Sequence, residues 1–288
     1  MKVKVLLKVL CIRFFEKFPQ MISDEKHAKL LYWIMFGHRP NLKNPTTLNE
    51  YICATKISDE KLDYWRYTDK YEVRKYVAET VGEQYLNQVV GLYDDFDAID
   101  FDALPNAFAM KATHGSSYNV IVSDKSKLNI SDARKKFKKW LKENYYYKDR
   151  EKNYKLIKPR IMCDAFLTPK GGQLEEYKLF CFNGKVGFIQ HNKQIEKSRY
   201  DNIFDPDWNI LPLKYGYGGF PDDRKPENAA ELISLAEKLS APFPFVRVDL
   251  YNVDGRIVFS ELTFHSGGGL VPFQPESYDR EFGKLLGL

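Results

Sequence analysis

The segment FVRVDLYNVDGRIVFSELTF, close to the carboxyl end, constrains the fold of this 288-residue chain most strongly. Its polar and apolar residues alternate with a period of two, as they do in a strand with two different faces. Arg247, Asp249 and Tyr251 share one face, and the apolar residues between them share the other. The pattern predicts a β-hairpin with one ionic face.

The turn in NVDGR decides whether the second strand adds its acid to that face. A two-residue turn would pair Asp249 with Ser260 and direct Glu261 away. A three-residue turn, with Gly255 left-handed in a bulge, would pair Asp249 with Phe259 and bring both carboxylates together. The sequence leaves both registers open.

Two carboxylates held on rigid strands suit a magnesium ion that takes its other ligands from phosphate oxygens and water. On this basis we predict Asp249 and Glu261 as metal ligands, with Arg247 beside them to complement the phosphates. The alternative is a solvated hairpin with a cross-strand Arg–Glu pair, which would contribute little to stability.

Two segments rich in small residues favour a bound ligand. The run from Gly267 to Gly269 follows the hairpin and allows close backbone approach, although such a run also occurs in loose turns. Upstream, Lys111 ends an apolar strand and is followed by Gly115, Ser116 and Ser117. This arrangement predicts a phosphate-binding loop, and the alternative is an exposed strand end.

Charge and cysteine content exclude several classes of protein. A formal charge of +5, from 44 basic and 39 acidic residues, lacks the single-sign field of a nucleic-acid-binding protein and fits a small anionic substrate better. The four cysteines lack metal-binding spacing and are expected to be reduced thiols in a cytosolic protein. No nucleophile elbow or HExxH motif supports covalent or zinc catalysis.

The first ninety residues have helical apolar spacing, and Thr47 followed by Glu50 predicts a capping box at a helix start. The opening segment MKVKVLLKVLCIRFFEKFP is apolar but interrupted by basic residues, so it does not predict a membrane span. It either rests on a membrane surface as a cationic helix or packs on the protein itself, which is the more common behaviour.

A β-rich region begins near Leu104. A basic helix over 131–144, a strand in IKPRIMCDAFL that carries Asp164 at its exit, and a hairpin at Asn183-Gly184 follow it. One more helix, over 226–239, precedes the final hairpin.

The order and spacing of LPNAFAMKATHGSS, EEYKLFCFNGK, FVRVDLY and ELTFHSGGG, with DKYEVRKYV upstream, resemble the TupA-like ATP-grasp proteins of teichuronopeptide and surface-polysaccharide biosynthesis. The resemblance extends from about Asp69 to Leu288. It implies an α+β ATP-grasp fold, in which two α+β lobes clasp ATP and Mg²⁺. A central lobe over 104–185 and a C-terminal lobe over 186–288 would follow a mainly helical region over 1–103.

The resemblance also implies roles for individual residues. Lys111 and its loop would bind phosphate, and Glu176 would contact ribose. Asp164 would lie in a hinge, where such enzymes usually have Glu, and the backbone after it, from Ala165 to Leu167, would meet the adenine edge. The implied nucleotide-binding set is Lys111, Gly115, Ser116, Ser117, Asp164, Ala165, Phe166, Leu167, Glu176 and Lys178. Arg247 and Lys178 would serve catalysis. Asp249, Glu261 and Thr263 would face the metal, with Thr263 in a place where many relatives have Asn, a better ligand.

The implied reaction is that of a carboxylate–amine ligase, in which a carboxylate attacks the γ-phosphate of ATP and an amine captures the acyl phosphate. The acceptor would be an acidic sugar or an amino acid used in capsule, O-antigen or teichuronopeptide synthesis, on the cytoplasmic side and at most peripheral to the membrane. A glycan kinase at the same ATP site is one alternative. A non-catalytic scaffold is a second, although it would tolerate loss of the nucleotide residues, whereas Lys111, Asp249 and Glu261 are all present. A glycosyltransferase is another, for which only DFD at 100–102 and DPD at 205–207 provide an Asp-x-Asp triplet.

Overall fold

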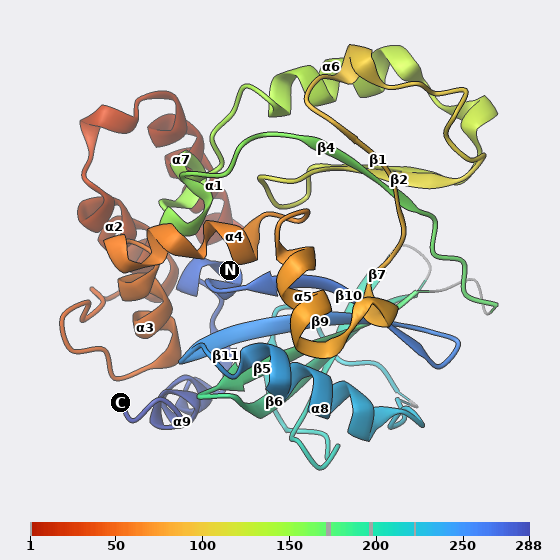
Figure 1. Cartoon of the computed structure of the whole chain (residues 1–288). Coiled ribbons are helices and arrows are strands. Elements are labelled where there is room, and N and C mark those ends of the chain that lie inside the picture. The colour runs from red at the N-terminus through yellow and green to blue at the C-terminus, as the bar shows by residue number, and fades with distance from the viewer. Residues whose placement is uncertain (1, 171–173, 196–197, 222) are drawn as a thin grey trace.

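The computed structural model describes residues 2–170, 174–195, 198–221 and 223–288. Within these ranges the chain forms two lobes, each built on an antiparallel sheet, and a group of helices beside both (Figure 1). The mixture of helices and antiparallel sheets, with helices at the N-terminus, confirms the α+β fold class.

The N-terminal third is helical, as its apolar spacing predicted. Its elements are α1 (Lys2–Lys17), η1 (Pro19–Met21), α2 (Asp24–Phe36), α3 (Leu48–Thr55), η2 (Asp59–Tyr64), α4 (Trp65–Thr68), α5 (Val73–Val81) and η3 (Glu83–Tyr85). Only half of the predicted capping box forms. Thr47 Oγ1 accepts a hydrogen bond from the Glu50 N–H at 3.2 Å, but the Glu50 carboxylate accepts from the N–H groups of Asn41 and Thr46 instead of Thr47.

The upper lobe in Figure 1 contains a four-stranded sheet in the order β1-β4-β2-β3, covered by α6. Phe108 from the sheet and Phe137 from α6 are both fully buried in its core. Residues 89–165 contain β1 (Val89–Tyr93), η4 (Phe96–Ala98), β2 (Phe108–Ala112), β3 (Asn119–Val122), η5 (Lys125–Lys127), α6 (Ile130–Trp140), α7 (Tyr146–Asp149), η6 (Lys152–Tyr154) and β4 (Ile161–Ala165). Of these, α7 and η6 contact the N-terminal helical elements α1 and η2.

The lower lobe contains a five-stranded sheet in the order β10-β9-β5-β6-β7, with α8 packed on one face. Its elements are β5 (Glu175–Phe182), β6 (Lys185–Ile195), β7 (Ser198–Phe204), β8 (Lys214–Tyr215), α8 (Ala229–Ser240), β9 (Phe245–Val253), β10 (Arg256–Thr263), η7 (Ser266–Gly269), β11 (Phe273–Gln274) and α9 (Ser277–Lys284). The predicted hairpin at Asn183 and Gly184 is confirmed, since their φ values of 48° and 76° match a type I′ turn.

The two faces of the lower sheet have different environments because strand residues alternate in direction. Leu179, Val248 and Leu250 point toward α8 and are almost completely buried. On the other face, Phe180 and neighbouring aromatic residues pack under β8, β11 and α9. The remainder of that face, with its charged residues, lies under the upper lobe.

Strand pairing crosses the boundaries suggested by sequence. β1 pairs with β4, so the upper sheet begins before residue 104, and β5 pairs with β9, so the lower sheet includes a strand that precedes residue 186. The ranges 1–103, 104–185 and 186–288 therefore remain a prediction about folding units and do not describe sheet membership.

Candidate functional site

The β9–β10 hairpin has a two-residue turn. Val253 pairs with Arg256, and Asp254 and Gly255 between them have φ values of 52° and 89°. Positive φ at both central residues is the type I′ geometry, which matches the twist of the flanking strands. This observation favours the first of the two registers considered from sequence, the one that would direct Glu261 away.

A β-bulge in β10 nevertheless turns Glu261 toward the face that carries Asp249. The ladder is irregular between Phe259 and Glu261, so Ser260 is an extra residue on β10. Glu261 takes the place opposite Asp249 that Ser260 would have in a regular ladder. Both carboxylates therefore share one face, by a route that neither sequence-based register contained.

Charged residues form a row across three strands. Glu261 on β10, Asp249 on β9 and Lys178 on β5 are consecutive ladder partners. Lys178 Nζ lies 2.9 Å from a carboxylate oxygen of Asp249 and 2.9 Å from one of Glu176. Burial opposes the charge on Lys178, yet the neighbouring Asp249 carboxylate raises its pKa above the ordinary value. Lys178 is therefore held as a cation on this face.

Arg247 connects this row to the glycine run. Its Nε and Nη2 donate to the two oxygens of Asp249 at 2.6 and 2.7 Å. Its Nη1 donates to Ser266 Oγ at 3.0 Å, and its Nη2 donates to Thr263 Oγ1 at 3.0 Å and to Glu261 Oε1 at 3.3 Å. One guanidinium, only partly exposed, thus fixes both carboxylates and the start of η7.

A cavity of about 570 Å³ lies between the two sheets, above the ionic face. It brings together most of the residues predicted from sequence. Those that line it are Lys111, Ser116, Ser117, Asp164, Leu167, Glu176, Lys178, Arg247 and Glu261. The upper lobe supplies the first five and the lower lobe the other four, so that the cavity is shared by both.

Five predicted residues do not line this cavity: Gly115, Ala165, Phe166, Asp249 and Thr263. Asp249 is fully buried beneath Arg247 and Lys178. The Ala165 N–H donates to the Gln88 carbonyl at 2.8 Å, and its carbonyl accepts from Asn87 Nδ2 at 2.8 Å. Because both polar groups of Ala165 have partners, an adenine contact would fall to the backbone at Phe166 and Leu167, which border an adjoining pocket.

Lys111 and Asp164 form an ion pair across β2 and β4, with Lys111 Nζ 2.8 Å from Asp164 Oδ2. Lys111 retains some exposure to the cavity, whereas the Asp164 side chain is buried. The aspartate thus holds the Lys111 ammonium at the cavity wall.

Lys70 is a cavity-lining residue that the sequence analysis did not single out. Its Nζ donates to the Gly115 carbonyl at 2.7 Å and lies 3.8 Å from Glu261 Oε2. Burial, aided by nearby Lys111, lowers its pKa from the ordinary value. The DKYEVRKYV motif contains this lysine, but only the folded chain places it between the small-residue loop and the hairpin.

The glycine run has the backbone geometry that its composition allows. Gly267, Gly268 and Gly269 have φ values of 57°, 66° and 70°, which other residues rarely adopt. The Lys56 ammonium, fully buried, donates to the Gly268 carbonyl at 2.9 Å and to Asp149 at 3.0 Å. The run is therefore a fixed turn, and Gly267 borders the cavity.

Glu261 has the properties of a magnesium ligand. Its Oε1 accepts from Thr263 and Arg247, whereas Oε2 has Lys70, at 3.8 Å, as its ionic neighbour among the described residues. Mg²⁺ is commonly bound by one or two carboxylates together with phosphate oxygens of a substrate and water. The Glu261 carboxylate, at the edge of a cavity with room for phosphates, could be one of these ligands. Asp249 has both oxygens engaged by Arg247 and Lys178, so its role as a ligand stays a prediction. Within the described ranges, no group of three or more His, Cys, Asp or Glu residues forms a metal-binding cluster.

Comparison with known families assigns the class of protein. Residues 50–287 match the family described as TupA-like ATP-grasp, which is more than half of the chain. The chain therefore belongs to the TupA-like ATP-grasp family, as the resemblance of its motifs predicted. No curated protein matches its sequence.

Several solved structures align with this chain at low similarity. An N5-carboxyaminoimidazole synthase from Aspergillus clavatus, solved with ADP and 5-aminoimidazole ribonucleotide, has a TM-score of 0.42 and 11% identity over 73% of this chain and 47% of its own. D-alanine–D-alanine ligase from Helicobacter pylori has a TM-score of 0.40 and 17% identity over 76% and 60%. The same enzyme from Bacillus anthracis, solved with ATP, has a TM-score of 0.41 and 14% identity over 75% and 57%. The chain spans between 47% and 60% of the length of these proteins.

Proposed function

We propose that this protein is an ATP- and Mg²⁺-dependent ligase that joins a carboxylate to an amine. The observation that carries the proposal is the shared cavity, which the Glu261 carboxylate borders and to which both lobes contribute cations. Lys70, Lys111, Lys178 and Arg247 all line it. Such a concentration of positive charge fits a triphosphate and would stabilise charge on a transferring phosphoryl group.

In the proposed reaction, a carboxylate oxygen of the acceptor attacks the γ-phosphorus of ATP. The bond from that phosphorus to the bridging oxygen breaks, and ADP leaves. The amine nitrogen then attacks the acyl carbon, inorganic phosphate departs, and the nitrogen loses a proton. When bound, Mg²⁺ would neutralise charge on the phosphates, and Glu261 would hold the metal ion. The protein contributes position and charge, since no side chain forms a covalent bond.

We further propose an acidic sugar or an amino acid as the acceptor, for the synthesis of a surface polysaccharide. The support is the part of the cavity wall that is formed by residues of β6 and β7 and by the segment after β8. There the Arg199 guanidinium lies 5.1 Å from the centre of the Tyr217 ring, and Gln190 and Asp201 line the wall. An aromatic ring with a guanidinium suits a sugar ring that carries a carboxylate.

A hydroxylamine trap tests the reaction. Wild-type protein with ATP and Mg²⁺ is given glucuronate, galacturonate and amino acids in turn, and ADP, phosphate and hydroxamate are measured. A ligase yields a hydroxamate with any acid that it activates, because hydroxylamine captures an acyl phosphate. A phosphorylated sugar without hydroxamate would identify a glycan kinase instead. Thermal stabilisation by a UDP-sugar but not by ATP would overturn the nucleotide site and favour a glycosyltransferase.

We also propose that the protein acts in the cytoplasm, in peripheral contact with a membrane. No helix among the described residues has the length and apolar content needed for a membrane span. The support for contact is the composition of α1, which combines apolar side chains with basic ones.

A further inference from the structure

The N-terminal helix α1 has two apolar faces, and the rest of the chain covers one of them. On the covered face, the Phe15 ring lies edge-on to His27 with centroids 5.8 Å apart, and Ile12 packs against the core formed by α2 and α3. Lys4 Nζ donates to the Met35 carbonyl at 3.2 Å, and Arg150 Nη2 donates to the Phe15 carbonyl at 3.3 Å. The helix is thus anchored on the protein, as the more common of the two expected behaviours requires.

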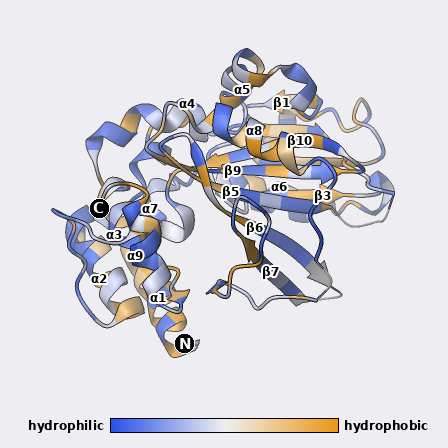
Figure 2. Cartoon of the chain, turned by 90° about the horizontal axis from the view of Figure 1, so that it is seen from below, coloured by the Kyte–Doolittle hydropathy of each residue, from blue (hydrophilic) through white to orange (hydrophobic). Residues whose placement is uncertain are grey.

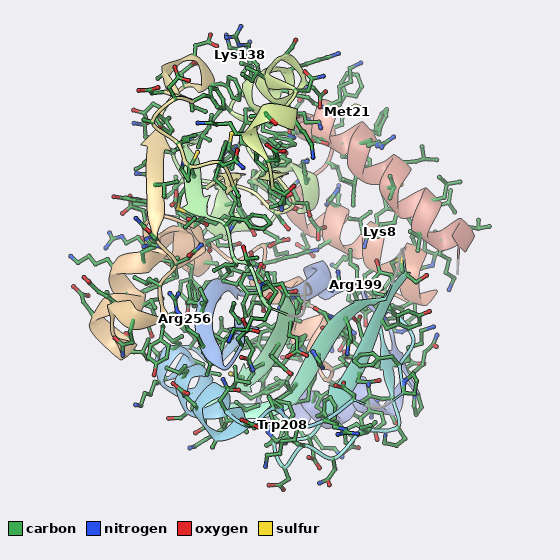
Figure 3. The ribbon with its side chains drawn as sticks, turned by 90° about the vertical axis from the view of Figure 1, so that its right-hand side faces the viewer. Lys8, Met21, Lys138, Arg199, Trp208 and Arg256 are labelled. Atoms are coloured by element: carbon green, nitrogen blue, oxygen red, sulfur yellow. The ribbon has the colours of Figure 1, made fainter. Side chains whose placement is uncertain are left out.

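The second apolar face of α1 is exposed. Val3, Leu6, Leu7, Leu10 and Phe14 are spaced at i, i+3, i+4, i+7 and i+11, which places them on one side of a helix. Their exposed fractions are 69%, 59%, 48%, 52% and 46%. Figure 2 shows α1 extending away from the sheets toward the N-terminus, with hydrophobic residues along it. Figure 3 shows the α1–η1 segment, marked by Lys8 and Met21, at the outer edge of the molecule.

The apolar stripe continues beyond the helix, and cations border it. Phe18 and Met21 are 37% and 63% exposed. Arg13 and Lys17 are exposed. By helical position Arg13 falls beside the stripe, and Lys17 falls at its C-terminal end, in line with Leu10 and Phe14. The helix carries five basic residues against one acid, Glu16. A contiguous exposed apolar face marks an interaction site, and this charge pattern restricts its partner.

We propose that this face of α1 docks on an anionic lipid surface, with the side chains of Leu6, Leu10 and Phe14 at the boundary between headgroups and acyl chains. A second copy of the chain fits less well. A symmetric dimer would enclose Arg13 and Lys17 of both subunits in one interface, to which α1 contributes only one acid, Glu16. Anionic headgroups complement these cations. The exposed face of α1 does not depend on the proposed ligase reaction.

Vesicle co-sedimentation tests this surface with the full-length protein. Wild type is mixed with phosphatidylcholine vesicles that contain 30% phosphatidylglycerol and with pure phosphatidylcholine vesicles. The test variant is Leu6→Gln with Leu10→Gln, whose side chains are half exposed. The matched control is Ile121→Gln, an equally exposed apolar residue on β3 of the upper lobe. Melting temperature and ATP-dependent thermal shift are measured on all three proteins to establish folding and an intact nucleotide site.

The expected result is binding of wild type and the control to anionic vesicles, at least tenfold weaker binding of the double variant, and reduced binding at high salt. Binding that is equal for the double variant and wild type overturns the proposal, as does failure of wild type to bind. A wild-type dimer in light scattering that becomes a monomer in the double variant would assign the face to a second copy. If ATP does not raise the melting temperature of wild type, the ligase proposal is overturned, whereas the proposal for α1 is unaffected.

Discussion

Glu261 lies directly opposite Asp249 in the β9–β10 ladder, because Ser260 is an extra residue that moves Glu261 by one place. Arg247 contacts both carboxylates, while Lys178 contacts only Asp249 among the two. The pair is therefore asymmetric. Asp249 is a buried partner for cations, whereas Glu261 faces the cavity.

This asymmetry predicts that Glu261→Gln abolishes turnover while the protein stays folded. The amide is a poorer metal ligand and removes a charge from the phosphate site, so we expect kcat to fall by about a hundredfold or more. ATP with Mg²⁺ should stabilise wild type in a thermal-shift assay much more than ATP with a chelator, and the variant should lose this difference. A variant that keeps most of its activity would remove Glu261 from the metal site.

Substitution of Lys70 should lower the affinity of the protein for ATP. Its Nζ links the Gly115 carbonyl to the neighbourhood of Glu261, so Lys70→Ala should weaken ATP binding by about tenfold or more, as expected for loss of a charge-assisted phosphate contact. Lys185→Ala is the matched control, because the Lys185 side chain is 77% exposed and lines neither the cavity nor the adjoining pocket. Titration calorimetry with a non-hydrolysable ATP analogue measures both. Equal affinities of the two variants would refute this role.

The buried His27 side chain should make the folded protein less stable at acid pH. It is fully buried, and neither ring nitrogen has a hydrogen-bond partner in the part of the chain that the structure describes. Burial, with smaller contributions from Lys56 and Arg150, lowers its pKa to about 3. Above pH 6.5 the ring is neutral in both the folded and the unfolded chain. As the pH falls below 6.5, only the unfolded chain takes up a proton, so folding free energy is lost at up to about 1.4 kcal/mol per pH unit until the folded pKa is reached.

His27→Leu should remove this contribution. Relative to wild type, the variant should gain about 2 kcal/mol of unfolding free energy between pH 8 and pH 5, as measured by urea denaturation at both values. His38→Leu is the control, because His38 is exposed, and it should follow wild type. Parallel profiles for wild type and His27→Leu would show that the buried ring is not the cause of acid sensitivity.

Because of the type I′ turn, we expect Gly255→Ala to lower the free energy of unfolding. Gly255 has φ of 89°, and an added Cβ would meet no atom within 4 Å, so the cost is backbone strain alone, about 1 kcal/mol. Gly218→Ala, also in open space but without a positive φ, should be nearly neutral. Denaturation midpoints of the two variants compare them directly. A neutral Gly255→Ala would mean that the hairpin does not need this turn.

Local sequence determined the elements of the site. Period-two alternation predicted the ionic face of β9, and Asn183-Gly184 predicted a tight hairpin, because both residues tolerate positive φ. At Asp254-Gly255 the sequence predicted a hairpin but left the length of its turn open. The order of the motifs was enough to recognise the family, which the match over residues 50–287 confirmed. These features could be predicted because each depends on residues close together in the chain.

Tertiary structure alone decided how those elements meet. The bulge at Ser260 has no signature in the alternation. In the folded chain Glu261 contacts Thr263 on its own strand, Arg247 on β9 and Lys70 before α5. Lys70 joined the site through a loop 45 residues away. The exposed face of α1 could be distinguished from its covered face only after α2 had packed against it. Sequence thus specified strands, turns and family, whereas long-range packing specified which charges share a cavity and which apolar face remains open.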